Sequence, residues 1–382
     1  MEVAGWLLFV VVLFHAGPAF VLMPGRTLRR FARRSDEPVV WPLVSVVIAA
    51  RDEEQRIGET LRGLLASDYS KLEVILANDR STDRTAEIAE SIAANDDRLR
   101  IVTIDQVPDG WLGKTNAMTQ VAKLASGEFL LFTDGDIQFS PDAIRLAMQH
   151  TVNRQLDHFC LFPSMETEGW SERVLVSFFA MLFAFGTQPW MQRLRLPTAY
   201  YGIGAFNLVR RSTYDEVGGH DSIRLDILDD VKLGKLLFKH RATVDFLVAE
   251  DAVRVRWQDS AWGVICGLEK NAFASMGYSV ARMLGFTVFF SLIFFAPFVV
   301  TMFATLESAL GYVATLILLH VTFGRLSAAF GGSVVVTPGL IFGAVGVLFA
   351  FWRSAFLTLR QGGVNWRETF YSLKDLRAGE YR

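Results

Sequence analysis

The sequence is poor in cysteine: Cys160 and Cys266 are the only two among 382 residues. Two cysteines cannot form the disulfide framework of a small secreted domain, and they fit a reducing compartment, most simply as small buried residues. An excess of basic charge is also missing, because the formal net charge is −2. The sequence therefore argues against a disulfide scaffold, and nothing in it points to a nucleic-acid partner.

Three familiar catalytic motifs are missing too. The sequence contains no HExxH zinc motif, no GxxxxGK[ST] phosphate loop and no GxGxxG dinucleotide fingerprint. Bound phosphates are therefore not expected to rest on a glycine-rich loop. Apolar residues, by contrast, are abundant: 51% of the chain is hydrophobic and 31 residues are Phe. This is too apolar for an ordinary soluble enzyme.

Much of the apolar excess lies at the two ends of the chain. Residues 3–23 form a run of about 20 apolar residues, which is long enough to span a bilayer as a helix. Only Glu2 is charged before this run, whereas five arginines follow it: Arg26, Arg29, Arg30, Arg33 and Arg34. A secretory signal has the opposite order. We therefore predict an uncleaved anchor over 1–25 and a basic linker over 26–42 in the cytoplasm.

A second apolar region, 283–358, predicts a multi-pass protein of the inner cell membrane. Spans are expected near 284–306, 309–329 and 335–357. Three spans would put the tail 359–382 outside, yet its basic residues favour the inside. These residues are Arg360, Arg367, Lys374, Arg377 and Arg382. One span is then re-entrant, interfacial or divided.

Residues 174–192 are apolar but short, and they lie within the globular part of the chain. They predict an interfacial segment, with Arg193 and Arg195 at the lipid headgroups. The alternative is a core helix.

Residues 43–282 have a globular composition in which strand-like and helix-like segments alternate. Buried strands are predicted over 43–51, 72–79, 100–105 and 127–134, and helices over 53–67 and 85–94. This alternation is typical of an α/β fold with an open, mostly parallel sheet, whose functional site lies at the carboxyl edge.

Acidic residues occur where these strands end. They are Asp52 and Glu53, Asp79 and Asp83, Asp134 and Asp136, and, later in the chain, Asp229 and Asp230. Singly, each has an ordinary explanation: Asp52 or Asp83 could cap a helix, and Asp79 could be a solvated turn residue. Together they need a further reason, because clustered carboxylates repel one another unless a cation or a donor-rich ligand lies among them.

A divalent metal supplies that reason. Asp134 and Asp136 flank Gly135, so both carboxylates can face one side of a turn. Hard oxygen ligands suit Mg²⁺ or Mn²⁺ bound together with phosphate oxygens. Lys114, just before a predicted helix, is a candidate phosphate contact, with a solvated lysine as the alternative.

An ordered set of motifs resembles the inverting glycosyltransferases of family 2, which have the GT-A fold. The motifs are AARDEE (49–54), NDRSTDRT (78–85), GKTNAM (113–118), TDGDI (133–137), GIGAFNLVRRSTYDEVGGH (202–220) and LDDVKLG (228–234). WLGK, the anchor, the C-terminal spans and the tail GGVNWRETFY further resemble the lipid-directed branch that acts on hopanoids and carotenoid acids.

The resemblance implies roles for individual residues. Asp52 and Asp79, with help from Glu53, match positions that bind the nucleotide, and Asp134 and Asp136 match the D-x-D pair that holds metal and sugar nucleotide. Asp230 matches the catalytic base. Asp229 before it departs from the usual Glu.

The segment Gly218, Gly219 and His220 matches the stretch before this base, and its glycines suit a loop near the acceptor. The Gln-x-x-Arg-Trp signature of processive polysaccharide synthases has no match. RWQDSAW (256–262) has the letters in the wrong order, and Lys270 in the same region is only a possible phosphate contact.

These observations predict a membrane-anchored enzyme that moves one sugar from a UDP-sugar to a lipid or isoprenoid acceptor at the cytoplasmic face. The alternatives are transfer to a polyprenyl phosphate, extension of a polysaccharide, and a non-catalytic membrane scaffold that binds a nucleotide. Transport is disfavoured, because the spans carry little charge beyond Arg325.

Overall fold

The computed structural model describes residues 1–33, 36–38, 40–367 and 369–381. Arg34 of the predicted basic linker and Arg382 of the predicted tail lie outside this range. The chain forms two compact units. We call the first the helical unit (Met1–Gly25, Met165–Ala199 and Trp257–Leu373) and the second the α/β unit (Arg26–Ser164, Tyr200–Arg256 and Lys374–Arg382).

A seven-stranded sheet forms the centre of the α/β unit, in the order β3-β2-β1-β4-β8-β6-β9. Its strands are β1 (Val44–Ala50), β2 (Leu72–Asp79), β3 (Leu99–Ile104), β4 (Phe129–Thr133), β6 (His158–Phe162), β8 (Asn207–Arg210) and β9 (Val244–Val248). β8 is antiparallel to both neighbours, and the other pairs are parallel. The predicted open, mostly parallel sheet is confirmed, and the four predicted strands agree within two residues at each end.

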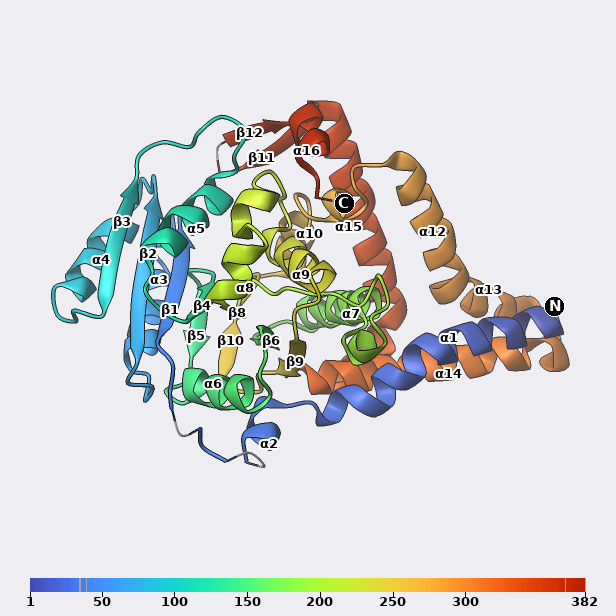
Figure 1. The fold of residues 1–382 in the computed structure, drawn as a ribbon. Coiled ribbons are helices and arrows are strands. Elements are labelled where there is room, and N and C mark those ends of the chain that lie inside the picture. Colours follow the sequence, from blue (N-terminus) through green and yellow to red (C-terminus); the bar gives the residue numbers. More distant parts are fainter. Residues whose placement is uncertain (34–35, 39, 368, 382) are drawn as a thin grey trace. The chain divides into compact units, whose positions relative to one another are not determined.

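Helices cover both faces of this sheet (Figure 1). They are α3 (Ile57–Leu65), α4 (Thr85–Ala93), α5 (Gly113–Leu124), α6 (Ala143–Asn153), α8 (Arg211–Glu216) and α9 (Asp229–Lys239), with the 3₁₀ turn η3 (Gly219–Ile223) before α9. Val121 of α5 and Leu236 of α9 share one buried cluster with Leu130 of β4. The right-handed crossovers through α3 and α4 place those two helices on the other face.

Short elements complete the α/β unit. β5 (Ile137–Phe139) pairs antiparallel with β10 (Val253–Val255), and β7 (Ser164–Met165) joins the other side of β10. The first helix of this unit along the chain is α2 (Leu28–Ala32), and the last is α16 (Leu373–Gly379). Cys160 is buried in β6, as expected, whereas Cys266 is half-buried.

Part of the predicted basic linker is built into the α/β unit. Arg26 pairs with Asp245, and its carbonyl oxygen accepts a hydrogen bond from Val248 N–H at 2.8 Å. Arg29 pairs with Asp142 and, at 2.6 Å, with Asp251. These arginines therefore fasten the chain to the β9 side of the sheet, where acidic side chains receive them.

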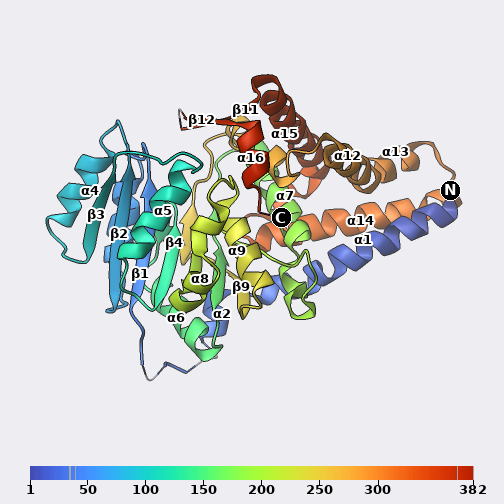
Figure 2. The same ribbon diagram turned by 45° about the horizontal axis from the view of Figure 1, so that its top comes forward.

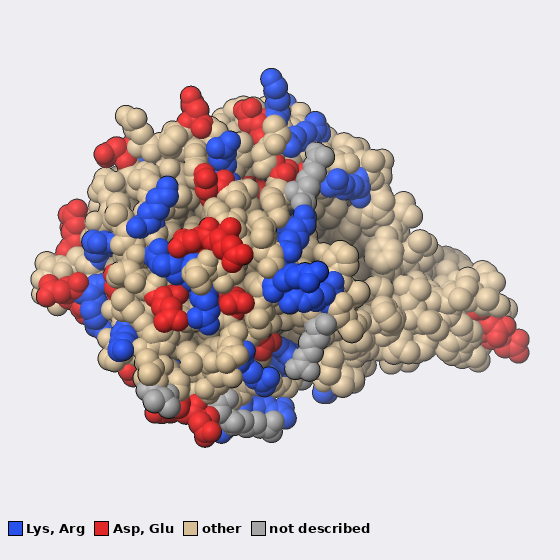
Figure 3. All heavy atoms as spheres, viewed as in Figure 1, with Lys and Arg blue, Asp and Glu red and all other residues tan. Residues whose placement is uncertain are grey.

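The helical unit contains the apolar segments. Its elements are α1 (Glu2–Leu22), η1 (Met23–Gly25), α7 (Trp170–Thr187), η2 (Pro189–Leu194), α10 (Ala261–Gly267), α11 (Ala272–Ser275), α12 (Val280–Phe294), α13 (Ala296–Phe303), α14 (Leu306–Ala329), η4 (Val334–Gly339), α15 (Leu340–Gln361), β11 (Gly363–Trp366) and β12 (Thr369–Ser372). In Figure 3 the surface over α1 and α14 is almost free of charge except at its tip.

Within the described residues, four helical segments are long and apolar enough to cross a membrane: Glu2–Leu22, Trp170–Gln192, Leu306–Ala329 and Val334–Gln361. A fifth is the pair α12 and α13, which bends by 44° at a short break. The helices predicted from apolar runs are thus present, and the run near 284–306 is divided in two.

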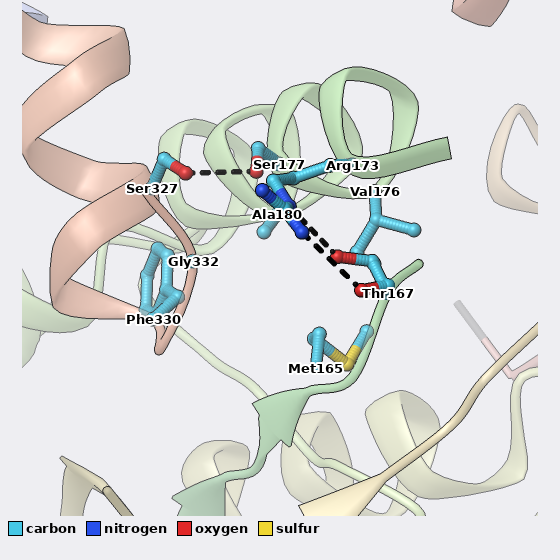
Figure 4. A pocket seen from close by; sticks show the side chains of 9 residues that line it. All are labelled: Met165, Thr167, Arg173, Val176, Ser177, Ala180, Ser327, Phe330 and Gly332. Atoms are coloured by element: carbon cyan, nitrogen blue, oxygen red, sulfur yellow. Dashed lines mark hydrogen bonds between the residues drawn. The ribbon is translucent and has the colours of Figure 1, made fainter. Parts of the chain in front are cut away.

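Helix α7 packs inside the helical unit. Val174 and Phe178 are buried, and they contact the glycines Gly339 and Gly343 at the start of α15. Ser177 and Ser327 share a hydrogen bond of 2.9 Å beside a small hollow between α7 and the end of α14 (Figure 4). The alternative of a core helix therefore describes α7 better than an exposed interfacial segment.

Helices α1 and α14 run parallel to each other. The backbones of Gly5 and Gly311 meet near their N-terminal ends, where a side chain on Gly311 would overlap Gly5. Fifteen residues further along α1, the carbonyl oxygen of Phe20 accepts a hydrogen bond from Arg325 Nε at 2.9 Å. Both views of the fold show the two helices side by side (Figures 1 and 2), and in Figure 1 α15 runs at a steep angle to them.

Candidate functional site

The Asp-Gly-Asp turn follows β4 directly and is fixed on both sides. Thr60 Oγ1 donates a hydrogen bond of 3.0 Å to the carbonyl oxygen of Gly135. Asp134 N–H donates one of 3.0 Å to the carbonyl oxygen of Gly204. Gly204 comes just before β8, and the antiparallel register pairs Phe132 with Asn207. The reversed direction of β8 thus brings Gly204 next to Asp134.

Lys114 lies between carboxylates from different parts of the chain. Its Nζ is 2.8 Å from Asp134 Oδ1 and 3.2 Å from Asp229 Oδ2. Burial lowers the pKa of Lys114, but the charges of the surrounding aspartates outweigh burial and raise it above the usual value. The alternative of a solvated lysine is wrong, and this side chain is a permanent cation.

Asp229 and Asp230 form the first turn of α9, where the helix dipole favours negative charge. Asp230 Oδ2 accepts a hydrogen bond from Gly204 N–H at 2.7 Å. Its pKa is raised to about 6, first by burial and then by the charge of Asp229, against the lowering effect of Lys114. A carboxylate with this pKa is ionised near neutral pH and still basic enough to accept a proton.

A close crossing of backbones sets this arrangement, and the sequence-based prediction missed it. A Cβ on Gly202 would overlap the carbonyl oxygen of Asp230, and a Cβ on Gly234 would overlap that of Tyr201. The segment before β8 therefore lies directly on α9, which only glycine allows. The Gly-Ile-Gly sequence at 202–204 was a signal for a close approach of backbones. It did not reveal that α9 is the element that lies against it.

Asp136 lies on the other side of the turn. Its pKa is raised to about 7, first by burial and then by the charges of Asp134 and Glu53, with Arg56 acting in the opposite direction. Arg56 Nη1 is 3.8 Å from Asp136 Oδ2. This arginine was not among the predicted site residues, because it is distant in sequence from the turn that it faces.

The carboxylates fit a divalent cation that is shared with a ligand. In the described residues, no group of three or more His, Cys, Asp or Glu side chains could hold a metal ion by itself. Mg²⁺ typically uses only one or two carboxylates plus substrate phosphates. Burial, followed by the charges of Asp134 and Glu53, raises the pKa of Asp136, and a bound cation would offset the part that comes from charge repulsion. Asp134 and Asp136 are the residues that would hold it.

Asp79 ends β2 in a buried position, 5% exposed. Its Oδ1 is 2.9 Å from Arg80 Nε. A side chain on Gly113 would come against this pair, so the start of α5 approaches the end of β2 closely. The alternative of a solvated turn residue for Asp79 is wrong.

Asp52, Glu53 and Asp83 organise the turns after β1 and β2. Asp52 has a φ of 55°, and its Oδ1 accepts hydrogen bonds from Thr82 N–H (2.7 Å) and Thr82 Oγ1 (3.2 Å). It does not cap α3, whose N-cap is Arg56. Glu53 N–H donates to Thr85 Oγ1 at 2.7 Å.

Asp83 accepts hydrogen bonds from Thr85 N–H at 2.9 Å and Glu54 N–H at 3.0 Å. The N-cap of α4 is Arg84, so Asp83 lies one residue before the cap, and its side chain holds the turn that leads into the helix.

The predicted acceptor-side residues lie around η3. Gly218 and Gly219 have positive φ angles of 80° and 50°. His220 is 1% exposed, and its Nδ1 is 2.9 Å from the Tyr214 hydroxyl. Burial, with nearby Lys114, lowers the pKa of His220 to about 3, so the ring is neutral. His220 therefore supports the loop from inside.

Lys270 belongs to the helical unit, where its Nζ lies 4.1 Å from the centre of the Trp366 ring.

Comparison with sequence families gives one match in this region: residues 45–218 match the sequence model of glycosyl transferase family 2. Two curated relatives are 4,4'-diaponeurosporenoate glycosyltransferases. The protein from Staphylococcus haemolyticus (strain JCSC1435) is 26% identical over 229 residues, which cover 58% of this chain and 60% of that protein. The protein from Staphylococcus aureus (strain USA300) is 27% identical over 193 residues, 50% of each. The chain thus spans 50 to 60% of the length of these relatives.

Among solved structures, the chain is similar to mannosyltransferase PcManGT from Pyrobaculum calidifontis in complex with GDP-Man and Mn²⁺. The TM-score is 0.50 with 16% sequence identity, and the match covers 93% of this chain and 98% of that one. The likeness extends to the fold, which is GT-A.

Proposed function

We propose, from the family 2 glycosyl transferase domain that residues 45–218 form, that this chain transfers a single sugar from a UDP-sugar to a lipid or isoprenoid acceptor with inversion. One observation carries the proposal: Lys114 and Gly204 bring Asp134, Asp229 and Asp230 to the same carboxyl edge of the sheet. A carboxylate that accepts a proton there lies beside carboxylates suited to a metal-bound diphosphate.

The donor side of the site comprises the ends of β1, β2 and β4. Asp52, Glu53 and Asp79 bind the nucleoside, Asp134 and Asp136 face the diphosphate, and Lys114 contributes a fixed positive charge. When bound, a divalent cation neutralises the negative charge that develops on the leaving diphosphate. UDP rather than GDP is the expected nucleotide, and Mg²⁺ or Mn²⁺ the expected ion.

Asp230 is the base. It takes the proton of the acceptor hydroxyl while that oxygen forms a bond to the anomeric carbon of the sugar. The bond from this carbon to the diphosphate oxygen breaks on the opposite face, so UDP leaves and the configuration inverts. Gly204 N–H holds Oδ2 of Asp230, and Lys114 limits the rise in its pKa, so the carboxylate is aimed and ionised near neutral pH. Asp229 keeps Lys114 in place.

A membrane-resident acceptor agrees with the apolar helices and with the curated relatives, whose names specify a carotenoid acid. The sugar is then added at the cytoplasmic face of the inner membrane. Helices in the bilayer let a water-insoluble acceptor reach the enzyme by diffusion in two dimensions.

The direction of the helices supports three crossings. The α/β unit begins at Arg26, directly after α1 and η1, and this unit is proposed to be cytoplasmic, so α1 ends on the cytoplasmic side of the membrane. α14 runs parallel to α1 and crosses in the same direction. The chain must therefore reach the far side before Leu306, and the bent pair α12 and α13 makes that crossing.

Two other apolar helices, α7 and α15, begin and end on the cytoplasmic side of the membrane, called the near side here. β6 before α7 and β8 after it pair in one sheet, so α7 does not cross alone. After α15 the chain returns to the α/β unit, because Lys374–Arg382 belongs to it. α15 starts on the near side and must end there, and it lies in the plane of the membrane with Phe349 and Phe356 exposed. Three crossings leave the tail on the cytoplasmic side, which removes the conflict with its basic charge.

The activity test compares the detergent-purified wild type with Asp136→Asn and Asp230→Asn. Asp97→Asn is the matched control, because Asp97 is exposed in the turn before β3, at the opposite end of the strands. A panel of UDP-sugars and GDP-mannose is supplied with Mn²⁺ and a total lipid extract, and nucleotide release and labelled lipid are measured. We expect Asp230→Asn to lower kcat by about 10² to 10⁴ with donor binding retained. Asp136→Asn should weaken Mn²⁺-dependent donor binding.

Activity in the wild type and the control, but not in the two site variants, supports the proposal. A wild type that binds a nucleotide and turns over no donor contradicts it and favours the nucleotide-binding scaffold. If GDP-mannose is the only donor turned over, the nucleotide is GDP rather than UDP, and the proposed type of reaction still holds.

A further inference from the structure

Glu380 and Tyr381 dock on the loop that carries the proposed base. After α16, Tyr381 N–H donates a hydrogen bond of 3.0 Å to Asp226 Oδ2. The carbonyl oxygen of Tyr381 accepts one of 2.7 Å from Lys232 Nζ. Asp226 and Lys232 thus hold the main chain of one residue from both sides.

This clamp is largely buried. Asp226 is 5% exposed and Lys232 is 8% exposed, and their side chains are 3.4 Å apart. Glu380 adds a carboxylate 3.5 Å from the same Lys232 Nζ. Removing one partner from such a group leaves buried charge without compensation, so the three side chains and the docked main chain stabilise one another.

Apolar contacts strengthen the docking. Leu376 of α16 is 1% exposed, and Tyr381 packs against the buried cluster that includes Leu233 and Leu236 of α9. The Tyr381 ring also lies 4.9 Å from Lys239 Nζ. The segment therefore covers both the loop before α9 and one side of that helix.

The position of the clamp gives it a consequence for the site. Asp226 and Lys232 flank residues 227–231, which include Asp229 and Asp230. We propose that residues 374–381 form a strap whose clamp by Asp226 and Lys232 positions Asp230 for catalysis. Lys232 is then a positioning residue that acts through the loop. The inference rests on the proposed function of Asp230 and deepens it.

The test uses the full chain and two perturbations of the strap: truncation after Gly379, and Lys232→Met. Lys232→Arg keeps the positive charge, and Lys123→Met on the exposed side of α5 is the matched control. The readouts are kcat and donor KM for transfer, the melting temperature, and hydrogen exchange of residues 226–232 and of the Gly204 amide that Asp230 holds.

We expect truncation and Lys232→Met to lower kcat at least about tenfold, with donor KM within about twofold of the wild type, and to speed exchange at residues 226–232 and Gly204. Lys232→Arg should restore most of kcat. The proposal that the strap positions Asp230 is overturned if kcat or hydrogen exchange is unchanged. It is also overturned if kcat, donor binding and the melting temperature all fall to the same extent.

Failure of the proposed function gives a different pattern. A wild type that turns over no donor refutes that function, but the exchange measurement needs no turnover. Faster exchange confined to 226–232 and Gly204 then still supports the strap as the element that holds Asp230, and unchanged exchange overturns it.

Discussion

Replacing Lys114 by Met tests the electrostatic centre of the site. The ammonium lies 2.8 Å from Asp134 and 3.2 Å from Asp229. The Asp229 side chain is 8% exposed, so its loss of a partner costs about 3 kcal/mol, the lower end of the range for a broken buried pair. The Asp134 side chain is 38% exposed, so solvent screens it and it adds at most about 1 kcal/mol. We therefore expect Lys114→Met to lower the free energy of unfolding by about 3 to 4 kcal/mol at pH 8.

The pH dependence identifies the cause of that loss. Without Lys114 the pKa of Asp230 rises, because the lowering influence of the lysine charge on this carboxyl has gone. Protonation at low pH then removes negative charge that Lys114 offsets in the wild type, so the destabilisation should be much smaller at pH 5 than at pH 8.

Urea unfolding in mild detergent at the two pH values measures the effect, with Lys114→Arg and Lys123→Met as controls. A loss of the same size at both pH values, or none at pH 8, would refute the reasoning.

Two further predictions follow from buried histidines and from the proposed crossings. Burial lowers the pKa of His158 to about 4 and that of His220 to about 3. The folded state therefore binds fewer protons than the unfolded chain, and stability present above pH 6.5 is lost on acidification, by about 2 kcal/mol per histidine at pH 5. Thermal melts between pH 7.5 and 5 measure the decline, and His220→Gln should flatten part of it; a flat profile for the wild type contradicts the prediction. In a cysteine-free background, an impermeant maleimide added to intact cells should label Leu306→Cys but not Asn365→Cys. Labelling of both from outside would mean that α15 crosses the membrane.

The carboxyl edge of the sheet was the predictable part. Strands that are buried on both faces have a clear apolar pattern, and parallel strands end at a common edge. Asp79 and Asp134 could therefore be placed at one edge from sequence alone. The motif order added Asp230, which lies far along the chain.

The contacts that assemble these residues were not predictable. Gly202 meets Asp230 and Gly234 meets Tyr201 through close approach of two backbones, and no local pattern reveals such a partner. Lys114 was a candidate phosphate contact in the sequence, but its pairing with Asp134 and Asp229 could not be foreseen because these partners come from distant segments. The docking of Tyr381 was likewise hidden, since a basic, aromatic tail has no periodicity that indicates what it binds.

Because α7 lies between β6 and β8 in the sequence, the strands of the sheet cannot all pair in the order in which they are synthesised. β6 ends at Phe162 and β8 begins at Asn207, yet β8 is the strand that lies between β4 and β6. While the ribosome adds the intervening residues 163–206, at roughly 5–20 residues per second, β4 and β6 each have an open edge, and such edges pair readily with the wrong chain. Helix α7, which packs within the helical unit, is made during this interval, so the sheet cannot close before α7 exists. Asp134 and Asp230 both bond to the backbone of Gly204, which comes just before β8, so these carboxylates can be brought together only after β8 has inserted between β4 and β6.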